Sequence, residues 1–406
     1  MIKSPVTTRH RTFIALGFLA LSAPLSRADD ASTQDSRVRF GGATSVDEEL
    51  EQDRLDSALN GFDHWEEWKK DLKERTGFEF TLEYNALSQF YSDGSDSSGG
   101  IFRLSGRWTV LNRGTDHYGA LVYKVDHRHA YDDISPQTGG IIAGSNLPTG
   151  TLYSDRDWGL VNLHWTQSLM NGRAGYAVGW FPADDYFHSY ALANPLTGFS
   201  NLAFSVGSDF ALPDSGLGIA ASGMLGDHWY VKGGVHDANG NAASPNLDLF
   251  DDWELYKNLE IGWTTDKERL FLDNIHLGFW HIDARSNVGT PEDWGIVGNA
   301  SWYFDDCRLL PFLRAAWSNG KASLVDRSIT IGLGKDFRER DQAGIGLSWG
   351  SPSESNRPDQ WTGEVYYRFQ EGSFAITPSL QFISNPASSP DDDVLILGAL
   401  RARWAF

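Results

Sequence analysis

Apolar and polar residues alternate one by one along most of the chain after Gly77. The first such stretch sets Phe78, Phe80, Leu82 and Tyr84 against Glu79, Thr81, Glu83 and Asn85. The same alternation recurs within 102–110, 258–263, 313–317 and 362–369. Successive side chains of a strand point to opposite faces, so the pattern predicts β-strands with one wet face and one apolar face.

A soluble β-sandwich would show the same period, but three features favour a membrane barrel. Aromatic residues gather at strand ends, as in the girdles at the two bilayer interfaces. The polar parity carries Arg, Glu and Asp, as expected for a water-filled lumen. The chain ends with Val394, Ile396, Gly398, Leu400, Ala402, Trp404 and Phe406 on one parity and Arg401 and Arg403 on the other. This last strand looks like the assembly signal of outer-membrane barrels.

The fold class predicted is therefore all-β: a closed, transmembrane, antiparallel barrel over residues 77–406. The pattern gives about seventeen candidate strands, and single-chain bacterial barrels usually have an even number, so about 16 is expected. The weakest candidates are 201–212 and 327–334. Long outer loops are predicted at 130–155, 182–200 and 237–252, and tight turns at 213–216 and 318–321.

The first 28 residues have the pattern of a secretory signal. They contain the basic residues Lys3, Arg9 and Arg11, the apolar stretch Phe13 to Leu21, and the small residues of Ser26-Arg27-Ala28 before the expected cut. The apolar stretch is too short to span a bilayer. We therefore expect export, a mature chain that starts at Asp29, and a place in the outer membrane.

Residues 29–76 form a polar and then helical N-terminal segment. Ser45-Val46-Asp47-Glu48 fits a capping box at a helix start. The apolar residues that follow recur three or four apart: Val46, Leu50, Leu59, Phe62, Trp65, Trp68 and Leu72. The segment is predicted to be a periplasmic cap or tether. An oligomerising coiled coil is the alternative, although the stripe does not hold three strict heptads.

Charge and cysteine content narrow the partners. The chain has 54 acidic and 34 basic residues, a formal charge of −20. This balance argues against nucleic acid as a partner, because phosphate binding needs a basic face. The single cysteine, Cys307, excludes a disulfide framework and a cysteine-based zinc site. No cofactor is expected.

The stretch from Gly179 to Gly240 resembles the carbohydrate-selective porin family of the OprB type. The likeness lies in a strand ending in Gly, an acidic turn before a Phe, a loop closing on FSNLAF, and the strand WYVKGGVHDANG. The segment 361–406 and the start W-x-x-W-K-x-x-L before Gly77 also look like that family. The resemblance implies a monomeric barrel of 16 strands with a loop-narrowed pore that passes neutral sugars.

A pore that attracts a sugar without trapping it needs donors and acceptors for the hydroxyls and aromatic faces for the C–H patches. Opposed Arg and Asp/Glu side chains supply both donors and acceptors. Strand parity and loop position select the pore-lining candidates Arg103, Arg107, Lys124, Asp126, Arg128, Asp184, Asp185, Tyr186 and Phe187. Trp180 is a further candidate as a sugar platform or a girdle residue. Lys232 and His236 are expected to line the lumen away from its narrow point.

Several alternatives stay open at this point. The candidate residues could be ordinary lumen charges that only keep the pore wet. The channel could be non-selective, or conduct anions or polysaccharide. A barrel enzyme acting on lipid or sugar polymer would need a nucleophile arranged with a His. The expected partners are neutral sugars, outer-membrane lipid and lipopolysaccharide, and the barrel-assembly machinery, which would read the strand ending at Phe406.

Overall fold

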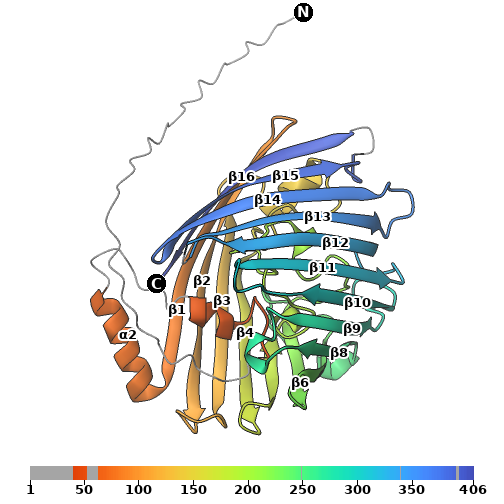
Figure 1. Cartoon of the computed structure of the whole chain (residues 1–406). Helices are drawn as coiled ribbons and strands as arrows, with labels where there is room; N and C mark the ends of the chain where they lie inside the picture. The colour runs from red at the N-terminus through yellow and green to blue at the C-terminus, as the bar shows by residue number, and fades with distance from the viewer. Residues whose placement is uncertain (1–39, 53–62, 248, 339, 390–392) are drawn as a thin grey trace, which may run out of the picture. The chain divides into compact units, whose positions relative to one another are not determined.

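The computed structural model describes residues 40–52, 63–247, 249–338, 340–389 and 393–406, so the signal segment 1–28 lies outside the described residues. Within this part of the chain, 16 antiparallel strands form one closed barrel in which each strand pairs with its sequence neighbours (Figure 1). The strands are β1 (Phe78–Tyr91), β2 (Asp96–Leu111), β3 (Gly119–Ala130), β4 (Asp157–Leu169), β5 (Ala174–Phe181), β6 (Gly216–Leu225), β7 (Trp229–Asp237), β8 (Leu255–Thr264), β9 (Asn274–Ile282), β10 (Asp293–Ser301), β11 (Leu309–Ser318), β12 (Val325–Asp336), β13 (Gln342–Pro352), β14 (Gln360–Glu371), β15 (Phe374–Ser384) and β16 (Val394–Ala405). The predicted barrel is confirmed.

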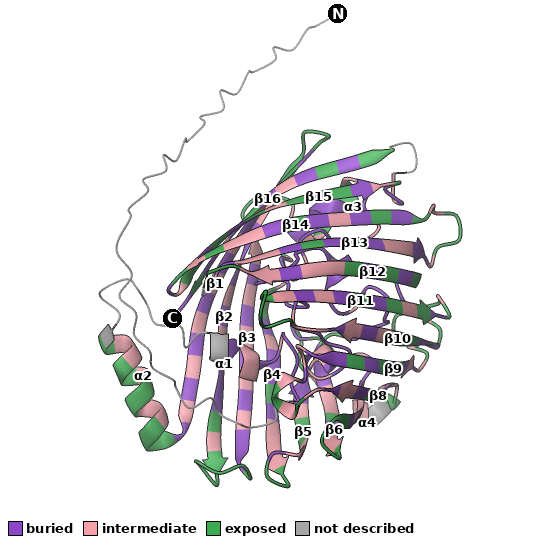
Figure 2. Cartoon of the chain, viewed as in Figure 1, coloured by how far each residue is buried: buried purple, intermediate pink, exposed green. Residues whose placement is uncertain are grey.

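The two parities of each strand have opposite surroundings, and Figure 2 shows the alternation along the strands. Leu259 and Ile261 are about half exposed on the outer face, whereas Glu260 between them is 1% exposed. The same contrast separates Leu400 from Arg401, which is 3% exposed. Apolar side chains outside and ionic ones inside suit a barrel whose outer surface meets lipid.

The barrel closes between its first and last strands. Glu83 pairs with Ala405, and the register runs on to Tyr91 and Leu397. One step further, Leu82 and Phe406 exchange both backbone N–H···O bonds, each 2.8 Å long. Since closure pairs every edge strand, the sheet has no open ladder to expose to lipid.

The connections alternate between two rims. The rim opposite the Phe78 and Phe406 ends carries the three longest, 131–156, 182–215 and 238–254, and the first contains α3 (Pro136–Ile142). The candidate strand 201–212 was wrong: it is part of the second loop, with a 3₁₀ turn at Leu202–Phe204. Its apolar residues pack inside the lumen instead of alternating between two faces. The candidate 327–334 is correct and lies in β12.

The turn predicted at 213–216 is not a hairpin turn, because it ends this same loop before β6. The turn at 318–321 does open the short connection between β11 and β12. The error follows from the false strand at 201–212, because a turn at 213–216 would have joined that strand to β6.

The N-terminal segment divides into two described helices. Helix α1 (Val46–Gln52) contacts inward-facing side chains of β2 and β3 and therefore lies in the lumen, where a periplasmic cap was expected. Helix α2 (Asp63–Thr76) lies on the other side of the sheet wall, where Trp65 and Trp68 pack edge-on against the outward-facing Phe80. Charge explains the difference, because α1 begins with three acidic residues and the wall beside it is basic.

Helices of the described residues are short or polar. None of them is both long enough and apolar enough to cross a bilayer.

A candidate pore constriction

The side chains of β2 and β3 that face the lumen bring together the first group of predicted site residues. Arg103 and Asp126 are paired across the two strands. The Arg103 guanidinium binds the carboxylate of Asp126 bidentately, with Nε to Oδ1 at 2.7 Å and Nη2 to Oδ2 at 2.9 Å. Arg128 approaches Oδ2 of Asp126 at 2.8 Å. Asp126 therefore lies between two arginines, and the three side chains form one buried group.

The network continues along β1 and into β16. Arg107 donates to Glu79, its cross-strand partner on β1. Glu83 pairs with Arg403 of the last strand at 2.9 Å, so the same band of charge crosses the closure of the barrel. We call the inward-facing charged residues of this band the ionic wall: Glu79, Glu83, Arg103, Arg107, Lys124, Asp126, Arg128 and Arg403.

Helix α1 docks on the ionic wall through its first acidic turn. Glu49 accepts from Arg103 at 2.7 Å and from Lys124 at 3.0 Å, and Asp47 accepts from Arg107 at 2.8 Å. The hydroxyl of Ser45 accepts from the Glu48 N–H at 3.4 Å, which agrees with the predicted capping box. Three predicted pore-lining cations are thus bound by the chain's own N-terminal segment.

The loop between β5 and β6 faces this helix with the second group of predicted residues. Asp185 is buried; its carboxylate accepts from Asn162 at 2.8 Å, and its carbonyl accepts from the Gly42 N–H at 2.6 Å. The Tyr186 hydroxyl lies 2.9 Å from the ring nitrogen Nε2 of His164. Asp184 is half-buried, and burial together with the neighbouring Asp185 raises the pKa of Asp184 to about 7.

Phe187 and Trp180 differ from the rest of the predicted set. Phe187 is fully buried and its ring lies over Gly234 of β7, so it anchors the loop rather than offering a face to the lumen. Trp180 has the parity of the outward-facing Tyr176 and Val178, and its indole N–H donates to the carbonyl of Leu160 at 2.8 Å. The geometry does not present Trp180 to the constriction as a sugar platform.

Lys232 and His236 of β7 lie nearer the constriction than the sequence pattern suggested. The Lys232 ammonium donates to the carbonyl of Tyr186 at 2.9 Å. The His236 ring meets that of Phe187 edge to face, with the centroids 6.1 Å apart. Both residues therefore touch the start of the constriction loop. The alternation along the strand predicted that both side chains face the lumen. It could not predict how close they lie to a loop that folds into the lumen.

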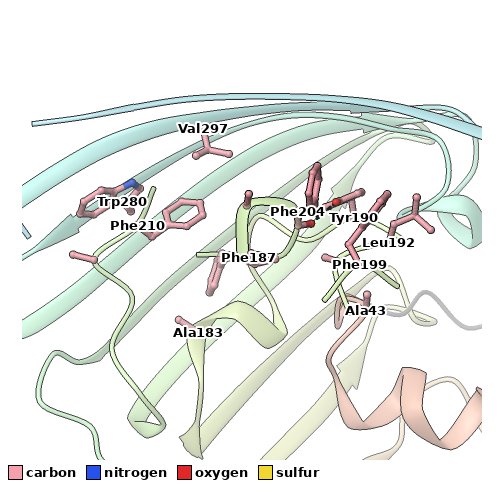
Figure 3. Close-up of a cluster of buried hydrophobic side chains, with 14 of the residues drawn as sticks. Ala43, Ala183, Phe187, Tyr190, Leu192, Phe199, Phe204, Phe210, Trp280 and Val297 are labelled. Carbon is pink, nitrogen blue, oxygen red and sulfur yellow. Dashed lines mark hydrogen bonds between the residues drawn. The ribbon is translucent and has the colours of Figure 1, made fainter. Parts of the chain in front are cut away.

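The rest of the loop packs as an apolar cluster against the opposite wall (Figure 3). Phe199 stacks on Phe204 with ring centroids 4.7 Å apart and meets Tyr366 of β14 edge-on at 5.0 Å. Phe210 packs edge-on against Trp280 of β9. The polar parity was expected to face a water-filled lumen. On this side the loop covers the inner face with apolar side chains instead.

A cleft remains between α1, the constriction loop and the inner face of β4 to β7. Its lining includes Asp47, Thr166, Tyr186, Ser222 and Lys232. Carboxylate, hydroxyl, phenol and ammonium groups thus face one space. Such a mixture can exchange hydrogen bonds with the hydroxyls of a polar permeant.

One buried group of the lumen has the composition of a metal site. His188, Glu260 and His276 offer ligand atoms within 4.8 Å of one another. The carboxylate of Glu260 already accepts from the His188 backbone N–H at 2.6 Å and lies 3.5 Å from the Lys232 ammonium. The neighbouring ammonium supplies the positive charge here, so the group serves as a hydrogen-bonded anchor for the loop at His188.

Sequence reasoning missed Asp47, Glu49 and Glu79 as members of the site. Glu79 was visible as a polar residue of β1 that faces inward. Asp47 and Glu49 carried a weaker signal, the cluster of acids at the start of a capped helix. That signal did not say where the helix would lie.

Comparison with known proteins agrees with this architecture. No curated protein matches the chain. A high-pH structure of Pseudomonas putida OprB superposes with a TM-score of 0.65 at 15% identity, covering 84% of this chain and 97% of that one. A low-pH structure of the same protein gives 0.53 at 14% identity, covering 86% and 98%. A mutant Rh. blastica porin gives 0.51 at 12% identity, covering 81% and 100%.

These likenesses, at such low identity, show the fold alone. The family comparison goes further, because residues 72–406 match the description "Carbohydrate-selective porin, OprB family". Family and barrel together indicate a channel rather than an enzyme, and they imply an outer-membrane location. The chain belongs to the carbohydrate-selective porins of the OprB family.

Proposed function

We propose that the chain is a passive outer-membrane channel for neutral sugars, and that permeants pass between the ionic wall and the start of the constriction loop. The observation that carries this proposal is the row of buried ion pairs on the barrel wall, Arg103 with Asp126 and Arg107 with Glu79. The start of the constriction loop adds the Asp185 carboxylate and the Tyr186 hydroxyl inside the lumen. Fixed charges of both signs offer donors and acceptors to sugar hydroxyls while leaving binding weak enough for release.

The location of the apolar cluster supports the same route. Phe199, Phe204 and Phe210 fill the lumen beside β9 to β14. A hydrated sugar would have to displace these rings to pass there, and burial of each ring is worth several kcal/mol, about 3–5 by comparison with Phe→Ala substitutions. The cleft beside β4 to β7 avoids these rings, and residues of the N-terminal segment, such as Phe40 and Asp47, form part of its lining.

Conductance of single channels in planar bilayers tests the proposal. Added glucose or oligosaccharide should reduce the ion current in a saturable manner, because an occupied constriction passes fewer ions. A current that stays unchanged across a wide screen of mono- and oligosaccharides would contradict selectivity for sugars and favour a general or anion-conducting pore.

Export and assembly complete the proposal. Residues 1–28 would direct the chain across the inner membrane and be removed before Asp29. The strand ending at Phe406 would be read by the barrel-assembly machinery, and the outer apolar band would meet lipid and lipopolysaccharide.

A further inference from the structure

The ionic wall holds an internal anion at the place where a permeant should bind. Residues 40–52 bring two carboxylates to three cations: Glu49 to Arg103 and Lys124, and Asp47 to Arg107. All three cations are less than one-tenth exposed. A buried cation needs an anionic or dipolar partner, because its desolvation is otherwise uncompensated.

Lys124 depends on this segment most completely. Its ammonium donates to the Thr44 carbonyl at 2.7 Å and lies 3.0 Å from Glu49, and both groups belong to residues 40–52. By contrast, Arg103 and Arg107 each have a second carboxylate on the barrel itself, Asp126 and Glu79. Without the segment, Lys124 would keep no carboxylate in direct contact among the described residues, and only the longer-range attraction of Asp184 and Asp185 in the loop would remain.

Glu49 satisfies this site only in part. Its Oε1 oxygen receives both cations, while its Oε2 oxygen is buried with no hydrogen-bond partner among the described residues. The Asn162 Oδ1 atom, on the β4 residue paired with Lys124, is also without a partner there. A ligand that takes the place of Glu49 with a carboxylate could use the cations, and an adjacent hydroxyl could donate to the free Asn162 Oδ1 atom.

We propose that Arg103, Lys124 and Arg107 form a binding site for the carboxylate of a sugar acid, and that residues 40–52 are its displaceable internal occupant. This inference rests on the proposed sugar channel and adds sugar acids to the neutral sugars that it passes. The segment bridges the wall and the constriction loop, since the Ala43 N–H donates to Ser189 Oγ at 3.0 Å. Its displacement therefore opens the passage as the ligand binds.

The first test measures how the Glu49 carboxylate competes with the carboxylate of an added sugar acid. Single-channel currents of the whole chain are measured with glucuronate and with glucose, in the native protein, in Glu49→Gln and in Glu67→Gln. Glu67 lies on α2 and is largely exposed, so Glu67→Gln makes the same charge change away from the site. Glu49→Gln should lower the half-blocking concentration of glucuronate about tenfold, because the site is then free in a larger fraction of molecules. The glucose response of Glu49→Gln should change less than its glucuronate response, because glucose brings no carboxylate to the cations, and Glu67→Gln should behave like the native protein.

A covalent lock supplies the second test. Ala43→Cys with Ser189→Cys, in a Cys307→Ser background, should join the segment to the constriction loop when oxidised. The oxidised channel should lose its response to glucuronate, and reductant should restore it. An oxidised channel that responds like the reduced one overturns the inference, as does Glu49→Gln with an unchanged glucuronate response while glucose still blocks. Absence of any response to either sugar in every variant would overturn the proposed function as well.

Discussion

The two sides of the lumen differ in the kind of side chain that they carry. Along β1 to β3 the inward residues are charged and paired in a network, such as Arg103 with Asp126. Along β9 to β14 they meet rings of the constriction loop, such as Phe204 and Phe210. The second side fixes the loop by burying apolar area, and the first keeps a polar surface beside the space the loop leaves. The apolar wall thus holds the loop, and the ionic wall is the one at which we propose that the permeant binds.

Removing the apolar anchors should have the largest effect. Phe199→Ala with Phe204→Ala empties the centre of the cluster, and each such truncation costs about 3–5 kcal/mol in a packed core. The strands keep their ladder, so we expect the loop to detach while the barrel persists, and single-channel conductance to rise several-fold. Phe90→Ala, on an exposed residue at the loop rim, should leave conductance unchanged. An unaltered conductance in the double variant would show that the cluster does not hold the loop.

On the ionic wall, Arg103→Ala should weaken sugar block rather than widen the pore. The change leaves Asp126 with Arg128 alone and Glu49 with Lys124 alone. We expect the half-blocking glucose concentration to rise about tenfold, which corresponds to about 1.4 kcal/mol, and the ion selectivity to shift toward cations. Arg173→Ala is the control, because Arg173 lies in the turn between β4 and β5 and is not part of the ionic wall. Equal effects of the two variants would show that the ionic wall does not contribute to sugar binding.

These two groups of residues were not equally predictable. Strand periodicity alone identified Arg103 and Asp126, because a period of two decides which face each residue takes. It could not identify the apolar wall, whose partners come from a loop more than 60 residues away in sequence, such as Phe199 beside Tyr366. The docking of Glu49 also lay beyond the pattern. A capped acidic helix signals attraction to a basic surface but does not say which surface.

A smaller effect should follow from a bulky residue at Gly346 of β13. A Cβ atom there would lie 2.5 Å from Phe204 Cε1 and 3.3 Å from Phe199 Cε1. Gly346→Val should push both rings from their places at a cost of about 1–3 kcal/mol, seen as faster proteolysis of the loop and noisier single-channel currents. Gly363→Val is the matched control, because a Cβ atom at Gly363 would lie no closer than 3.8 Å to its nearest neighbours. Identical proteolysis of the two variants would contradict the packing role of Gly346.

The smallest effect concerns pH. Because the pKa of Asp184 is raised to about 7, its carboxyl is mostly neutral at pH 6 and mostly ionised at pH 8. Cation selectivity should therefore increase as pH rises through 7, by less than about twofold for one added charge. Reversal potentials in a salt gradient measure this, and Asp184→Asn should flatten the profile. A profile that is equally steep in Asp184→Asn would place the titrating group elsewhere.

Thiol accessibility tests the division of the lumen most directly. In a Cys307→Ser background, Ser222→Cys lies on the cleft beside β4 to β7, and Thr330→Cys lies under the constriction loop next to the Ala203 carbonyl. A charged, water-soluble thiol reagent should reduce the current quickly in the Ser222→Cys channel, with glucose slowing the reaction, and should barely affect Thr330→Cys. Faster modification at Thr330→Cys, or equal rates at both, would contradict a passage along the ionic side.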